Sequence, residues 1–182
     1  MNIAERIGKG EWPQIPVWEE IATYIGTDPE RFHQLMSIFF SDDDALVLRT
    51  GQILCRIHDK HPELVEPYLE QLIERLSTNP TDGFKRNALR CFQKGKLPED
   101  EEMEGQLFDY CIHTLSSAEE PTAVKVFGMT AARRICERYP ELAIELIHPI
   151  EILVEENFSA GVVNRGQKEL KRLRKIIEQL DQ

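Results

Sequence analysis

Residues 57–64 of the chain read Ile-His-Asp-Lys-His-Pro-Glu-Leu, and residues 135–142 read Ile-Cys-Glu-Arg-Tyr-Pro-Glu-Leu. The two stretches lie 78 positions apart (135 minus 57), and both end in Pro-Glu-Leu. The same offset places residues 81–84, Thr-Asp-Gly-Phe, on residues 159–162, Ser-Ala-Gly-Val, without a gap. Two matches at one offset indicate an internal repeat.

Helical signals fill the chain around these stretches. A proline that follows a turn residue, as in Asp28-Pro29 or His61-Pro62, marks a helix start, because the first N–H groups of a helix are unpaired in any case. No alternation of polar and apolar residues is bounded by Asn-Gly or Gly-Gly, so strands are not expected. The apolar periodicity predicts nine helices, at residues 14–25, 29–40, 42–60, 62–77, 82–94, 99–116, 120–138, 140–156 and 159–180.

The repeat interval of 78 residues contains two of these helix pairs, so one pair takes about 39 residues. The pattern resembles HEAT repeats of the armadillo-like superfamily, in which a short turn with an acidic residue joins two helices and the second helix carries an arginine in its first turns. The acid and the arginine are found here as Asp42 to Asp44 with Arg49, and as Asp82 with Arg86. The third pair departs from this pattern, and the fourth has Ala160 in place of the acid but keeps Arg165.

The resemblance implies an all-α fold, a right-handed α-α superhelix of four helix pairs. Helix 14–25 is expected to cap the first pair. Residues 14–182 are expected to form a single domain, and residues 1–13 an N-terminal arm. No helix pair can bury its apolar face alone, so the pairs must stack. Gly51, Gly128 and Gly166 fall within second helices, where close approach of a neighbouring helix would compensate for their low helix propensity.

Composition narrows the class of protein. The chain has 182 residues, of which 41% are hydrophobic and 30% charged, as in an ordinary globular domain. No apolar run reaches the ~18 residues that span a membrane, and the first residues lack the apolar core of a signal peptide. We therefore expect a cytoplasmic protein that does not bind membranes. The net charge of −10 disfavours unguided attraction to nucleic acid.

The metal-binding and redox-active residue types give no site. The spacing of the cysteines matches no zinc signature, and free cysteines are usually buried as small apolar residues. These cysteines are Cys55, Cys91, Cys111 and Cys136. A metal site at His58, Asp59 and His61 is the alternative, but no further ligand converges on it. We expect no metal and no cofactor.

Charge separates between the first and second helices of the second to fourth pairs. The first helices of the second to fourth pairs carry a net −14, whereas the second helices of all four pairs carry +7. Second helices line the concave side of a HEAT-like solenoid, so the resemblance implies a basic concave face. The basic residues expected there are Arg49, Arg56, Arg86, Arg90, Lys94, Arg133, Arg165, Lys168, Arg172 and Lys175.

Two interpretations of this basic face stay open. The residues could be solvated helix surfaces, with Arg49 and Arg86 in structural pairs at the turns. They could instead form a groove for an acidic partner, since a basic concave surface focuses its field on anionic ligands. On the second interpretation the protein is a scaffold that binds an acidic protein or peptide.

Nucleic-acid binding is the alternative function, by fold-level resemblance to the HEAT-like alkylpurine DNA glycosylases. The basic stripes contain few aromatic residues that could stack on a base, which weakens this alternative. No phosphate loop, carboxylate pair or nucleophile motif occurs, so we expect no enzymatic activity and no catalytic residue.

Overall fold

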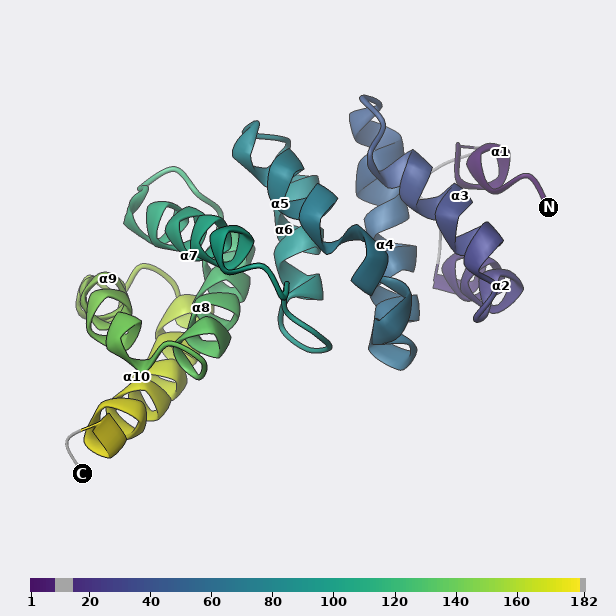
Figure 1. Ribbon diagram of the computed structural model, residues 1–182. Coiled ribbons are helices and arrows are strands. Elements are labelled where there is room, and N and C mark those ends of the chain that lie inside the picture. Colours follow the sequence, from purple (N-terminus) through teal and green to yellow (C-terminus); the bar gives the residue numbers. More distant parts are fainter. Residues whose placement is uncertain (9–14, 181–182) are drawn as a thin grey trace. The chain divides into compact units, whose positions relative to one another are not determined.

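A computed structural model describes residues 1–8 and 15–180 (Figure 1). Within these ranges all regular structure is helical, so the expected fold class, an all-α solenoid of helix pairs, is confirmed. The α-helices are α1 (Ile3–Gly8), α2 (Ile15–Ile25), α3 (Pro29–Phe39), α4 (Asp44–Lys60), α5 (Leu69–Ser77), α6 (Asp82–Cys91), α7 (Glu101–Ser116), α8 (Thr122–Cys136), α9 (Ala143–Glu155) and α10 (Ala160–Leu180). Three 3-10 turns, Pro62–Leu64, Glu66–Tyr68 and Pro140–Leu142, precede α5 and α9.

The main differences from the expected helices lie at prolines and at the N-terminus. The helix expected at 62–77 begins only at Leu69, because Pro67 has no N–H to donate and restricts the preceding turn. Residues Ile3–Gly8, expected in an arm, form a short helix that buries Ile3 and Ile7. Residues 9–13 of the expected arm lie outside the described residues.

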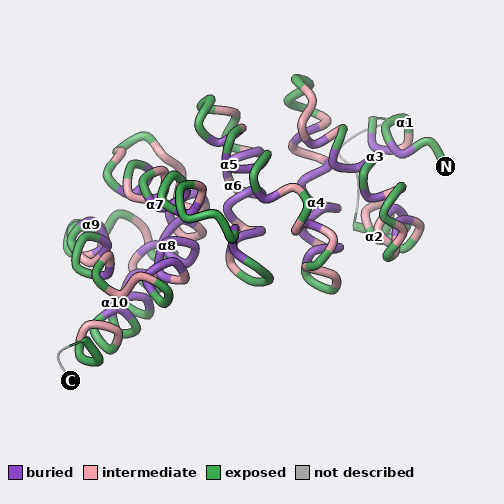
Figure 2. Tube along the Cα trace, in the orientation of Figure 1, coloured by how far each residue is buried: buried purple, intermediate pink, exposed green. Residues whose placement is uncertain are grey.

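The chain divides into two compact units, Met1–Lys96 and Leu97–Gln182, here called the N-terminal and C-terminal units. The single domain expected over residues 14–182 stays a prediction. In each unit the helices pair as expected, α3 with α4 and α5 with α6, then α7 with α8 and α9 with α10. The second helices also pack on each other, α4 on α6 and α8 on α10. Figure 2 shows buried residues along α6 of the N-terminal unit and along α8 of the C-terminal unit.

The core of the N-terminal unit is centred on aromatic residues. The rings of Phe39 and Phe84 stack with their centroids 4.6 Å apart, and both side chains are buried. Asn87 of α6 is also buried there, where its amide donates to the carbonyl of Gly83 and its oxygen accepts from the thiol of Cys55. This polar contact fixes α6 against α4, because a buried amide without partners would be costly.

Glycine permits close helix packing in both units, as expected. A Cβ on Gly51 would lie 2.1 Å from Nδ2 of Asn87, and a Cβ on Gly166 would lie 2.6 Å from a methyl of Val154. Both distances are shorter than van der Waals contact. The close α4–α6 and α9–α10 contacts therefore require glycine at positions 51 and 166.

Candidate partner-binding surfaces

Arg90 of α6 and Lys94, which follows the end of α6, share a single carboxylate at the end of α4. Asp59 Oδ2 lies 2.8 Å from Nη2 of Arg90, and Asp59 Oδ1 lies 3.2 Å from Nζ of Lys94. Lys94 also donates to the main-chain oxygen of Asp59. Arg86, half-buried on α6, makes no hydrogen bond or ion pair within the described part of the chain. We call Arg86, Arg90 and Lys94 the α6 stripe; its charge is partly neutralised by Asp59.

The two arginines expected on α4 hold α1 and α2. The guanidinium of Arg49 donates to the carbonyl of Ile7, 3.0 Å away at the end of α1. Arg56 lies over the ring of Trp18, 4.6 Å from its centroid, and its Nε is 2.9 Å from Glu19 of α2. Both side chains are half-buried. Their contacts support the structural interpretation for this helix.

A buried carboxylate organises the arginines between α8 and α10. Glu169 of α10 is fully buried, and its Oε2 lies 2.8 Å from Nε of Arg133, itself only 9% exposed. Arg172 lies 3.3 Å from the same oxygen. Arg165 donates to the hydroxyl of Thr130 at 2.7 Å and lies 3.6 Å from Oε1 of Glu169. Arg133 also forms an ion pair with Glu137, so two carboxylates already compensate its charge and it is poorly suited to bind an acidic partner protein.

The outer side of α10 carries the exposed positive charge of the C-terminal unit. At about 100° per residue, one arc of some 120° contains five basic side chains, opposite the buried Gly166, Leu170 and Leu173. Of these, four are exposed and Arg165 is half-buried. We call this set the α10 stripe: Arg165, Lys168, Lys171, Arg172 and Lys175. Lys171 was missed in the sequence analysis, although its position on the helical wheel could have revealed it.

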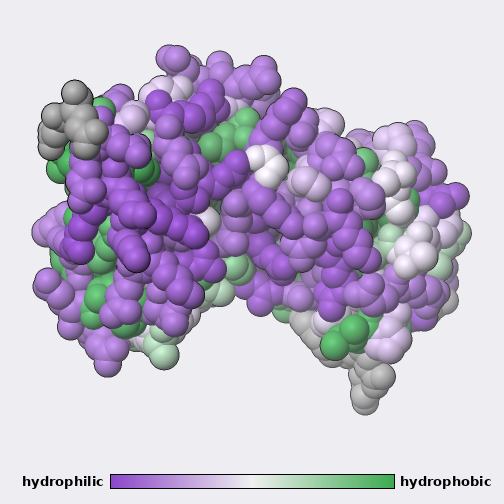
Figure 3. Space-filling model, turned by 90° about the horizontal axis from the view of Figure 1, so that it is seen from below, coloured by the Kyte–Doolittle hydropathy of each residue, from purple (hydrophilic) through white to green (hydrophobic). Residues whose placement is uncertain are grey.

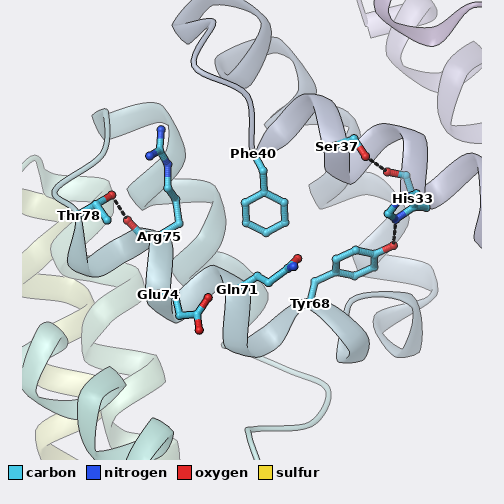
Figure 4. Close-up of a pocket in the computed structure, with 8 residues that line it drawn as sticks. All are labelled: His33, Ser37, Phe40, Tyr68, Gln71, Glu74, Arg75 and Thr78. Atoms are coloured by element: carbon cyan, nitrogen blue, oxygen red, sulfur yellow. Dashed lines mark hydrogen bonds between the residues drawn. The ribbon is translucent and has the colours of Figure 1, made fainter.

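A groove between α3 and α5 was not expected from the sequence (Figure 4). It lies wholly within the N-terminal unit and has a volume of about 470 Å³. The ring of Phe40 projects into it, with His33 and Tyr68 on one side and Gln71 and Glu74 on the other. The Tyr68 hydroxyl and His33 Nδ1 are hydrogen-bonded at 3.0 Å. Burial of the phenol, together with the charge of Glu30, raises the pKa of Tyr68, which keeps the hydroxyl protonated.

Buried ionisable groups elsewhere are structural. Lys125 of α8 donates to the carbonyls of Thr114, Leu115 and Ser117 at the C-terminal end of α7. Burial lowers the pKa of this ammonium, opposed by the charge of Glu120. A cation at this position satisfies carbonyls that the helix leaves unpaired and complements its dipole.

The four thiols are buried and free, as expected. Burial raises the pKa of each, and for Cys111 and Cys136 the pKa rises to about 12. A thiol with so high a pKa is a poor nucleophile at neutral pH, because the thiolate is the reactive form. Residues 1–8 and 15–180 contain no group of three or more His, Cys, Asp or Glu side chains placed to hold a metal ion.

The surface is mainly hydrophilic on the face drawn in Figure 3, where hydrophobic residues form small separate groups. No helix of the described ranges combines the length and apolar character needed to cross a bilayer.

Neither the curated proteins nor the solved structures contain a match to this chain. A family model described as a HEAT repeat domain matches residues 14–173, which is most of the sequence. The chain therefore belongs to the HEAT repeat family.

Proposed function

We propose that the protein is a HEAT-repeat interaction module that binds an acidic segment of a partner protein through the α10 stripe. HEAT repeats generally serve as scaffolds for protein interactions, and the family match supports this general role. The observation that carries the specific proposal is the exposed row of Lys168, Lys171, Arg172 and Lys175 opposite the core of α10.

The stripe is suited to binding because part of it is already ordered. Glu169 and Thr130 hold the guanidinium of Arg165, and Glu169 also contacts Arg172. These contacts restrict two long side chains before a partner arrives, which lowers the entropic cost of binding. The three lysines, in contrast, are exposed and add net positive potential. Their field would accelerate association with an acidic segment and weaken with added salt.

An acidic protein segment fits this surface better than single-stranded nucleic acid. Proteins that bind single strands stack bases on aromatic side chains beside the basic residues. Residues 160–180 contain no aromatic residue. The net charge of −10 also opposes a polyanion that extends beyond the stripe.

The proposal is tested by charge reversal on the stripe. The double variant Lys168→Glu/Lys175→Glu changes two exposed side chains and leaves the contacts of Glu169 in place. The binding of fluorescein-labelled hexa-glutamate is measured by anisotropy at 50 and 150 mM salt. We expect the double variant to weaken binding at least tenfold at the lower salt concentration.

The control is Lys60→Glu/Lys96→Glu, which reverses two exposed lysines of the N-terminal unit, of which Lys96 lies 3.3 Å from Glu66. It should change the affinity by less than threefold. Equal losses in both double variants would refute the α10 stripe as the binding surface. A labelled 20-nucleotide single strand that binds more tightly than hexa-glutamate, with the same dependence on Lys168 and Lys175, would favour the nucleic-acid alternative.

A further inference from the structure

The groove between α3 and α5 brings the aromatic rings of Phe40 and Tyr68 together with the carboxylate of Glu74. Phe40 and Tyr68 present their rings to the groove, and Glu74 lies at its edge (Figure 4). The exposed carboxylate of Glu74 makes no ion pair with any residue of the described ranges. The neighbouring Arg75 is paired with Asp42, 2.9 Å away, so its charge is compensated.

The same chain shows which group completes such a combination. On α2, the ring of Trp18 and the carboxylate of Glu19 together hold the guanidinium of Arg56, at 4.6 Å from the ring centroid and 2.9 Å from the carboxylate. The guanidinium of Arg31 likewise lies 4.3 Å from the ring centroid of Tyr24 and 3.3 Å from Asp28. In both cases an arginine stacks on an aromatic face while a neighbouring carboxylate forms an ion pair with its guanidinium.

We propose that the α3–α5 groove binds an arginine side chain from a basic segment of a partner protein. The guanidinium would stack on Tyr68, beside Phe40, and form an ion pair with Glu74. Further carboxylates that make no ion pair within the described residues, Glu30 on α3 and Glu70 on α5, would attract the basic residues flanking that arginine.

Size and rigidity suit this ligand. The volume of about 470 Å³ lies within the range of small-ligand pockets and accommodates one long side chain. Tyr68 is fixed by its hydrogen bond to His33 and by an edge-on contact with Phe32, whose ring centroid is 5.8 Å away. Phe40 is held beside the buried ring of Phe84, 6.0 Å between centroids. The aromatic surface is therefore preorganised.

This inference goes beyond the proposed function, since it concerns the opposite charge of ligand and the other unit of the chain. The probe is fluorescein-labelled hexa-arginine, titrated at 150 mM salt so that diffuse attraction is screened. Glu74→Gln is compared with Glu145→Gln, which removes the same charge from an exposed position on α9. We expect Glu74→Gln to weaken binding at least fivefold and Glu145→Gln to weaken it less than twofold.

A second comparison tests the aromatic contribution. Tyr68→Phe keeps the ring and should bind within twofold of wild type, whereas Tyr68→Leu should lose at least fivefold. Thermal melting shows whether either variant unfolds; if Tyr68→Leu does, the Glu74 comparison decides. N-acetyl-arginine amide should compete for the site, while the uncharged citrulline analogue should not.

Nuclear magnetic resonance locates the site independently, because binding should shift the amide signals of residues 33–40 and 68–78. Equal effects of Glu74→Gln and Glu145→Gln, equal binding by Tyr68→Phe and Tyr68→Leu, or shifts confined to other residues would each overturn the proposal. None of these outcomes bears on the binding of hexa-glutamate to α10.

Discussion

Glu169 and Arg133 face each other between α10 and α8, with 2.8 Å between Oε2 and Nε and less than a tenth of either side chain exposed. Such a pair is costly to desolvate, and removal of one partner leaves the other charge buried without compensation. The arrangement explains why a helix rich in basic residues can pack against a second helix that also carries arginine. The carboxylate offsets charges that would otherwise repel each other across the contact.

The first prediction concerns this carboxylate. Glu169→Gln keeps the shape and the contact with Thr130 but removes the charge that Arg133, Arg165 and Arg172 share. We expect the free energy of unfolding to fall by about 3 kcal/mol, measured by urea denaturation. Glu178→Gln removes an exposed charge from the same helix and should change stability by less than ~0.5 kcal/mol. Similar stabilities of the two variants would contradict a structural role for Glu169.

The second prediction compares two glycines within helices. Gly166→Ala places a Cβ 2.6 Å from Val154, and we expect a loss of about 2 kcal/mol from overpacking. Gly105→Ala, on an exposed side of α7, meets no atom within 4 Å. Because alanine has the higher helix propensity, this variant should gain ~0.5–1 kcal/mol. Thermal melting measures both; a stabilising Gly166→Ala would show that α9 and α10 do not pack as described.

Sequence reasoning recovered the helix pairs because their signals are local. The two Pro-Glu-Leu turns at residues 62–64 and 140–142 fix the repeat, and both fold as 3-10 turns in the structure. The short helix α1 was missed because six residues are too few to show a period, although Ile3 and Ile7 have the spacing of one helical face.

The state of the basic residues could not be predicted in the same way. Whether an arginine is free depends on acids brought close by packing, such as Asp59 beside Arg90, 31 positions apart in the chain. The burial of Glu169 between basic neighbours in sequence is likewise a property of the α8–α10 contact. The α3–α5 groove joins residues as distant as His33 and Tyr68, 35 positions apart, and no local pattern marks it.

The third prediction concerns the thiols. Native Cys111 and Cys136, with pKa values of about 12, hold only about one part in ten thousand as thiolate at pH 8. Labelling by a chromogenic disulfide should therefore be at least a hundredfold slower in the native protein than in guanidinium. The labelling rate of the native protein should rise about tenfold per pH unit between pH 7 and pH 9. The labelling rate of the unfolded protein should instead begin to level off near the ordinary thiol pKa of about 8.5. Rapid native labelling of all four thiols would show that they are not buried.

The fourth prediction separates a structural arginine from a free one. Arg49→Ala removes the hydrogen bond to the carbonyl of Ile7, and we expect α1 to loosen at a cost of about 1–2 kcal/mol. Arg86→Ala removes no hydrogen bond or ion pair within the described residues and should cost less than ~0.5 kcal/mol. Hydrogen exchange at residues 3–8 should accelerate in the first variant alone. Unchanged exchange there would remove the role assigned to Arg49 in holding α1.

The last prediction concerns the positive charge of the α6 stripe that Asp59 neutralises. Asp59 takes up Arg90 and Lys94, so Asp59→Asn should release two cations beside Arg86 while the main-chain oxygen still accepts from Lys94. In the Lys168→Glu/Lys175→Glu variant, where the α10 stripe has lost two of its positive charges, Asp59→Asn should raise the affinity for hexa-glutamate at least threefold. Asp109→Asn, at an exposed position of α7, makes the same change in net charge and should restore less. The comparison matters because attraction at 150 mM salt acts over about 8 Å, so a distant charge contributes little. If both asparagine variants restore binding equally, only net charge is at work, and the α6 stripe has no binding role of its own.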